Sequence, residues 1–161
     1  MILLMRKRYV MQHLNLPSYD FRIRGDERQR EIFDEIRKKF VALTPEEWVR
    51  QNFLKYLIAE KGTPLSLITV EKSLKLHGML KRTDIVVYDR NGKALLLIEC
   101  KAPSVKIDQK VFDQAAMYNI KFRVNYLVVT NGLEHFGCKI DFLKKNYHFL
   151  EHIPDFIEMQ G

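Results

Sequence analysis

Asp84, Glu99 and Lys101 are the residues of this sequence whose types and spacing best suit a chemical role. Two carboxylates supply oxygen ligands of the kind that Mg²⁺ binds, commonly together with waters and a substrate phosphate. A bound divalent ion lowers the pKa of a water enough to make it a nucleophile, and a nearby ammonium group holds that water or the charge that develops on a phosphate. The three residues therefore indicate metal-dependent hydrolysis of a phosphate ester, with Mg²⁺ or Mn²⁺ as cofactor.

A predicted β-hairpin is the reason to expect these side chains to meet. Asn91 and Gly92 lie between two apolar runs, and Asn-Gly in that position is a strong signal for a two-residue turn. With this loop, Asp84 lies opposite Glu99, and Lys101 projects from the same face two residues further on. Like charges directly opposite each other destabilise a sheet, so the pair needs a compensating cation. We therefore expect Asp84→Asn to raise the melting temperature of the metal-free protein.

A purely structural interpretation of the same residues stays open. Asp84 and Lys101 would then end strands at a solvated edge of the sheet, with Glu99 paired to Lys101 or Lys72 at the surface. Glu-x-Lys triplets occur by chance in many sequences, so the triplet alone does not decide between the two interpretations.

The elements that must position these residues follow from the periodicity of apolar side chains. Thr44 as N-cap, Pro45 in the first turn and Glu47 three residues after the cap predict the start of a helix. In chain order we expect a helix over 45–60, strands over 67–73, 84–89 and 93–101, a helix over 108–119, a strand over 125–130 and an edge hairpin over 135–142 and 146–150. The strand, helix, strand order implies a crossover between parallel strands, so the fold class is α/β with a mixed central sheet.

The composition is that of an ordinary globular domain with an excess of positive charge. The chain has 161 residues, of which 47% are hydrophobic and 29% charged, and a formal net charge of +7, which favours an anionic partner such as nucleic acid. We expect one domain over 44–161, preceded by a basic N-terminal arm over 1–43 with one helix or strand. Two cysteines are too few for a disulfide framework, and no apolar run is long enough to span a membrane, so we expect a cytoplasmic protein.

Several motifs in the right order resemble the signature of PD-(D/E)XK nucleases. They are Thr83-Asp84, then Glu99-Cys100-Lys101-Ala102-Pro103, then Gln114 with Tyr118 on the second helix, and Thr130-Asn131-Gly132 at the end of a strand. This variant is similar to the N-terminal nuclease domain of type I restriction enzyme R subunits, here as a stand-alone module. The resemblance implies a restriction-endonuclease-like core of helix, three strands, helix and strand.

The resemblance also implies a set of metal ligands. Asp84 and Glu99 would bind the metal, with the backbone carbonyl of Cys100 as a third ligand. A carboxylate on the first helix often joins such a site, and Glu47 is the candidate, although its capping role with Thr44 explains it equally well.

For the other site residues, the resemblance implies contacts to water and DNA. Lys101 would position or activate the attacking water, Gln114 would contact DNA or that water, and Tyr118 would support Gln114. Gln114 is predicted to lie within the apolar face of its helix, with Val111 and Ala115. The function implied is a divalent-metal-dependent endodeoxyribonuclease, acting alone, as a homo-oligomer or with a restriction-system partner.

Two functions of other classes remain as alternatives. In the second hypothesis, the same scaffold is a non-catalytic DNA-binding or assembly module that keeps these residues for structure. A protein that binds no nucleic acid, and whose basic charge only keeps it soluble, is the third hypothesis.

Overall fold

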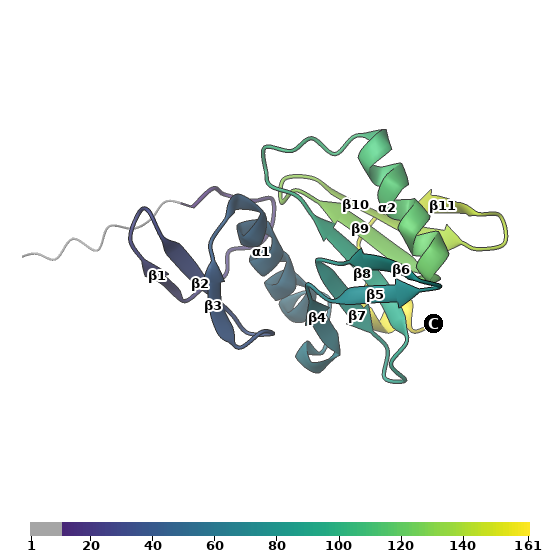
Figure 1. Cartoon of the computed structure of the whole chain (residues 1–161), viewed down its shortest axis with the longest axis horizontal. Coiled ribbons are helices and arrows are strands. Elements are labelled where there is room, and N and C mark those ends of the chain that lie inside the picture. The colour runs from purple at the N-terminus through teal and green to yellow at the C-terminus, as the bar shows by residue number, and fades with distance from the viewer. Residues whose placement is uncertain (1–10) are drawn as a thin grey trace, which may run out of the picture.

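A six-stranded mixed sheet forms the centre of the computed structural model, which describes residues 11–161 (Figure 1). The strand order is β11-β10-β9-β8-β7-β4, with bounds β4 Ile68–Val70, β7 Ile85–Tyr88, β8 Ala94–Cys100, β9 Tyr126–Thr130, β10 His135–Asp141 and β11 Asn146–Phe149. Strands β8 and β9 run parallel, and the other neighbouring pairs are antiparallel. The predicted α/β class, mixed sheet and C-terminal edge hairpin are confirmed.

Helix α1, Pro45–Ala59, covers one face of this sheet and begins as predicted. The Thr44 hydroxyl accepts a hydrogen bond from the Glu47 amide at 3.0 Å, which satisfies an amide that the helix cannot pair internally. Val49 and Phe53 are fully buried against β7 and β8. The short helix α3, Phe156–Met159, packs into the same core.

Helix α2, Gln109–Phe122, covers the opposite face and extends three residues beyond the predicted end. The predicted apolar face of this helix is only partly correct, since Ala115 is buried and Val111 packs against the core but Gln114 does not lie within the buried stripe. The buried side chains are those of Phe112, Ala115, Ala116 and Asn119, so the helix is rotated away from the expected stripe and Gln114 is exposed. The polar Asn119 is buried because its side chain donates to the carbonyl of Tyr126.

The β7–β8 hairpin has the predicted register but not the predicted turn. Ile85 pairs with Ile98. This is the pair next to Asp84 and Glu99 in the predicted register. At the turn, however, the Asp89 amide donates to the carbonyl of Lys93, so the loop is one residue longer than predicted. The Asp89 carboxylate accepts bonds from two loop amides and favours this wider turn. An irregularity between Val87 and Tyr88 then restores the register.

The predicted strand over 67–73 is divided into a 3-10 turn, η1 (Leu65–Leu67), and strand β4. At Glu71 the backbone adopts a φ of 52°, and the chain leaves the central sheet. It then forms a separate two-stranded hairpin of β5, Ser73–Leu76, and β6, Met79–Arg82. The sequence analysis did not predict this hairpin.

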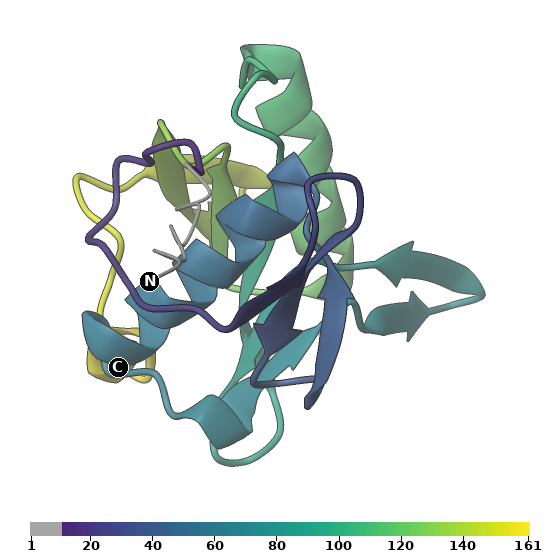
Figure 2. The ribbon, with the colours of Figure 1, turned by 90° about the vertical axis from the view of Figure 1, so that its left-hand side faces the viewer.

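The N-terminal region contains more regular structure than expected. Strands β1 (Ile23–Gly25), β2 (Arg30–Asp34) and β3 (Lys39–Ala42) form a three-stranded antiparallel sheet next to α1 (Figures 1 and 2). The expectation of a single helix or strand there was wrong, because the short strands are separated by turns and carry mixed charges that hide their alternation. Residues 1–10 of the predicted arm lie outside the described residues. Among residues 11–161, no helix has the length and apolar character needed to cross a membrane.

Candidate active site

Four of the predicted site residues line one cavity of about 130 Å³ between β8, β9 and α2. Glu99 and Lys101 enter it from the end of β8, and Gln114 and Tyr118 enter it from α2. Glu99 projects toward α2 because it alternates with Cys100, whose thiol is buried in the core beneath α1. The burial of the thiol raises the pKa of Cys100, so the side chain is an uncharged core group.

Lys81 is the partner of Glu99 in this cavity. Its ammonium nitrogen lies 2.8 Å from Oε1 of Glu99 and 4.3 Å from the centre of the Tyr118 ring. The ammonium group therefore neutralises Glu99 while it packs on the face of the aromatic ring. Because Lys81 belongs to strand β6, this contact also holds the β5–β6 hairpin against the cavity.

Asp84 lies beside the cavity, at the start of β7, with both carboxylate oxygens engaged. Oδ1 is 2.8 Å from Nη2 of Arg50, and Oδ2 accepts a hydrogen bond from the Cys100 amide at 2.8 Å. The first bond comes from helix α1 and the second from the neighbouring strand β8. Asp84 is consequently fixed between two elements, and the repulsion expected between Asp84 and Glu99 is compensated by Arg50 and Lys81.

Arg50 connects Asp84 to a buried network of charges. Only 5% of its side chain is exposed, and it also pairs with Glu47. Glu47 in turn accepts from Arg37 at 2.5 Å and from Gln51 at 2.9 Å. Burial alone would lower the pKa of Arg50, but the hydrogen bond to Asp84 and the charges of Glu47 and Asp84 raise it, so the guanidinium stays charged.

The network continues into the N-terminal sheet through Asp34 at the end of β2. The buried Asp34 carboxylate accepts from the side chain of Arg37 at 2.7 Å and from the side chain of Gln51 at 2.8 Å. A chain of ionic contacts therefore runs from Asp34 through Arg37, Glu47 and Arg50 to Asp84.

The structure does not bring Glu47 to the cavity. Its carboxylate faces Arg37 and Arg50, and only its amide takes part in the predicted cap. On the same helix, the Glu46 carboxylate lies 3.6 Å from Nη2 of Arg50, the nitrogen that also pairs with Asp84. Burial raises the pKa of Glu46, and the nearby charge of Asp84 raises it further, against the opposing effects of Arg50 and Lys101.

The donor chemistry of the site fits a hard divalent cation. Asp84, Glu99 and Glu46 offer carboxylate oxygens, and Mg²⁺ is commonly bound through one or two carboxylates, with waters and phosphate oxygens as its other ligands. Within residues 11–161, no group of three His, Cys, Asp or Glu side chains is close enough together to hold a metal by itself. Waters or substrate oxygens are therefore needed to complete the coordination.

The sequence analysis missed Glu46, Arg50 and Lys81. Glu46 and Arg50 are four residues apart on α1, and that spacing already placed them on one face of the predicted helix. Lys81 gave no signal, because the hairpin that carries it was not recognised.

Comparisons with known proteins agree with this architecture. The profile of the family described as type I restriction enzyme R protein N terminus matches residues 45–154. A solved fragment of an HsdR subunit of a type I restriction enzyme from Vibrio vulnificus YJ016 is similar in fold, with a TM-score of 0.52 and 20% sequence identity over 73% of the chain. The chain spans 25% of that protein fragment. A search of curated proteins gave no significant match.

Proposed function

Because the chain belongs to the family of type I restriction enzyme R protein N termini, we propose that it is a divalent-metal-dependent endodeoxyribonuclease domain that hydrolyses DNA phosphodiester bonds. The observation that carries the proposal is the convergence of Glu99, Lys101, Gln114 and Tyr118 on one cavity, with Asp84 directly beside it. The order of elements supports a restriction-endonuclease-like core, since α1, β4, β7, β8, α2 and β9 follow the sequence helix, three strands, helix and strand.

Asp84 and Glu99 are the proposed holders of Mg²⁺ or Mn²⁺, together with the backbone carbonyl of Cys100. Glu46 shares Nη2 of Arg50 with Asp84 and would add a further carboxylate through a bridging water. When bound, the cation would lower the pKa of a water and neutralise charge on the phosphate. Asp84 is suited to this role because Arg50 and the Cys100 amide fix its orientation before any ligand arrives.

Lys101 supplies the ammonium group that orients the attacking water and stabilises the charge that develops on the phosphate. Its own amide donates to the carbonyl of Thr130 at 2.8 Å, so the backbone at this position is held by the next strand. Gln114 is exposed at the cavity, where its amide is available to a phosphate oxygen of DNA. Tyr118, one helical turn beyond Gln114, forms part of the cavity wall beside it and packs against the ammonium group of Lys81.

The proposed partners are DNA and the other components of a restriction system. The net charge of +7 agrees with a polyanionic partner. A second candidate function is a non-catalytic DNA-binding or assembly module. One observation favours it, because Arg50 and Lys81 already neutralise the two carboxylates that would otherwise require a metal.

A cleavage assay with a supercoiled plasmid and labelled oligonucleotides separates the two functions. We expect the wild type to cleave DNA in Mg²⁺ or Mn²⁺ and not in EDTA, and Lys101→Ala to lose cleavage while it keeps the melting temperature. Lys93→Ala is the matched control, since Lys93 is an exposed lysine at the opposite end of strand β8. DNA binding without metal-dependent cleavage by the wild type would establish the non-catalytic module instead.

A further inference from the structure

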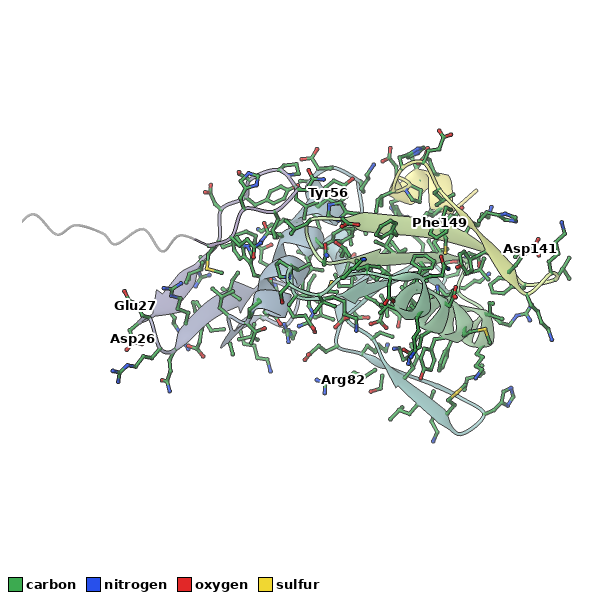
Figure 3. The ribbon with its side chains drawn as sticks, turned by 90° about the horizontal axis from the view of Figure 1, so that it is seen from above. Asp26, Glu27, Tyr56, Arg82, Asp141 and Phe149 are labelled. Carbon is green, nitrogen blue, oxygen red and sulfur yellow. The ribbon has the colours of Figure 1, made fainter. Side chains whose placement is uncertain are left out.

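The β5–β6 hairpin stands off the body of the protein next to the candidate active site (Figures 2 and 3). Its first strand begins two residues after Glu71, and its second strand ends at Arg82, directly before Thr83-Asp84. At its base the Glu71 amide donates to the carbonyl of Asp84, and the Thr83 amide donates to the carbonyl of Lys72. The position of the hairpin is thus tied to the backbone of a proposed metal ligand.

The hairpin has the properties of a stiff ribbon. His77 and Gly78 form its tip with φ values of 46° and 77°, as in a tight turn whose twist matches that of the strands. Leu76 pairs with Met79 on either side of this turn. On the inner face, Leu74 packs against the core beneath α2, and Lys81 pairs with Glu99. Both contacts fix the hairpin relative to the cavity.

The outer face of the hairpin is basic and exposed. Lys75 and Arg82 alternate with the inner-face residues, and Leu80, 66% exposed, lies opposite Lys75. Residues 72–83 hold four lysine or arginine side chains and no acidic residue. Lys81 pairs with Glu99 and Arg82 pairs with Glu71 at 2.9 Å, which leaves Lys72 and Lys75 as the hairpin cations proposed to meet DNA. Figure 3 shows Arg82 pointing away from the ribbon, at the base of the hairpin.

We propose that the β5–β6 hairpin is a DNA-contacting arm that enters the major groove of duplex DNA and sets the position of the adjacent phosphate at the cavity. This inference rests on the proposed function and adds the substrate form and the surface that binds it. The major groove is about 12 Å wide and admits a two-stranded β-ribbon. Lys75 on the outer face is suited to contact phosphates along the groove, as is the exposed Lys72, whose ammonium group lies 5.1 Å from the centre of the Tyr88 ring at the base of the hairpin. The exposed Leu80 offers apolar contact to thymine methyl groups.

Binding of a labelled duplex, measured by fluorescence anisotropy in EDTA over a range of salt concentrations, tests the proposal without cleavage. The variant Lys72→Ala/Lys75→Ala removes two charges from the hairpin. The matched control, Arg90→Ala/Lys93→Ala, removes two charges from the exposed turn at the opposite end of β7 and β8. Affinity falls as salt rises, so the slope of log affinity against log salt is negative. We expect this slope to become less negative by about two for the hairpin variant and to stay unchanged for the control. Melting temperatures verify that both variants are folded.

The outcomes distinguish this inference from the proposed function. Equal loss of affinity in the two double variants, with the wild type bound to duplex, would overturn the hairpin assignment and leave the nuclease proposal intact. A hairpin variant that loses affinity for a single strand as strongly as for the duplex would overturn the duplex assignment. A wild type that binds no DNA would remove the proposed function itself.

Discussion

Nη2 of Arg50 and Oδ1 of Asp84 lie 2.8 Å apart, which joins helix α1 to the strand that begins the candidate active site. The contact is the last link in the ionic chain that starts at Asp34 in the N-terminal sheet. Because Arg50 is almost completely buried, Asp84 is one of its two close counter-charges, with Glu47, as well as a proposed ligand. This pairing changes what the removal of the Asp84 charge is expected to do.

Asp84→Asn should lower the stability of the metal-free protein, contrary to the expectation from sequence. The substitution removes one of the two close charges that balance Arg50 and weakens a charge-assisted hydrogen bond, at a cost of about 1.5–3 kcal/mol. Thermal unfolding in EDTA measures the effect, with Glu151→Gln as an exposed control. A higher melting temperature for Asp84→Asn would mean that repulsion from Glu99 outweighs the pairing with Arg50.

The sequence predicted which residues pair between β7 and β8, but it did not predict which cations neutralise the carboxylates of the site. A two-residue turn at Asn91-Gly92 predicted the pairing of Ile85 with Ile98, and this pairing is confirmed because the irregularity between Val87 and Tyr88 offsets the extra loop residue. The Asn-Gly signal gave the wrong loop length, since the Asp89 carboxylate stabilises a wider turn. The shared face of Glu99 and Lys101 followed from strand alternation, whereas the site roles of Gln114 and Tyr118 followed from the family resemblance.

The compensating cations could not be predicted, because both depend on contacts between distant segments. Arg50 and Asp84 are 34 residues apart in sequence. Lys81 reaches Glu99 only because Glu71 adopts a positive φ and directs the chain into the β5–β6 hairpin. The helix carboxylate was misassigned for a similar reason. The sequence pattern suggested Glu47 as the helix carboxylate of the site. In the structure this carboxylate pairs with Arg50 of the same helix and with Arg37, which lies between β2 and β3 of the N-terminal sheet.

Asp34 should contribute stability that is lost in acid. Burial alone would raise its pKa, but hydrogen bonds from the backbone and side chain of Arg37 and from Gln51 lower it below the ordinary value of 3.8. A carboxylate with a lowered pKa in the folded state stabilises the protein above its unfolded pKa, and this stabilisation disappears as the pH falls through the folded pKa. The stability difference between wild type and Asp34→Asn should therefore shrink as the pH is lowered from 7 to below 3.8.

Urea unfolding at a series of pH values measures this difference. Asp20→Asn, at an exposed aspartate in the same N-terminal region, is the control and should change stability by less than about 0.5 kcal/mol throughout. A stability difference for Asp34→Asn that is constant from neutral to acidic pH would show that the carboxylate acts through packing alone.

Gly132→Ala should destabilise the protein strongly, because the glycine lies where the N-terminal segment packs against helix α1. Its φ is +84°, and an added Cβ would come within 2.7 Å of Leu14 and 3.1 Å of Val49. Strain of the left-handed backbone costs about 1–2 kcal/mol, and overpacking adds about 1–3 kcal/mol. Gly92→Ala is the control, since φ there is +82° with no atom within 4 Å of the added Cβ. Equal losses in the two variants would show that Leu14 moves away without cost.

Lys81→Ala should strengthen the response of the protein to divalent metal. The ammonium group of Lys81 lies at Oε1 of Glu99. A metal ion that binds this carboxylate must therefore displace the ammonium group or bind close to a second positive charge. In the wild type, Mg²⁺ or Mn²⁺ at about ten times its Kd should stabilise the folded state by about 1.4 kcal/mol. The Lys81→Ala variant should reach the same gain in melting temperature at a lower metal concentration, whereas Glu99→Gln should lose most of it.

Lys75→Ala provides the matched control for this metal titration. It removes the same charge from the same hairpin, but from the outer face, away from Glu99. Its metal response should equal that of the wild type, because only a cation in contact with the ligand competes directly for the carboxylate oxygen. If Lys81→Ala weakens the metal response, Lys81 supports the metal site instead of competing with it. If all variants, Glu99→Gln included, respond to metal like the wild type, Glu99 is not a metal ligand, and the carboxylates then act as the counter-charges of Lys81 and Arg50.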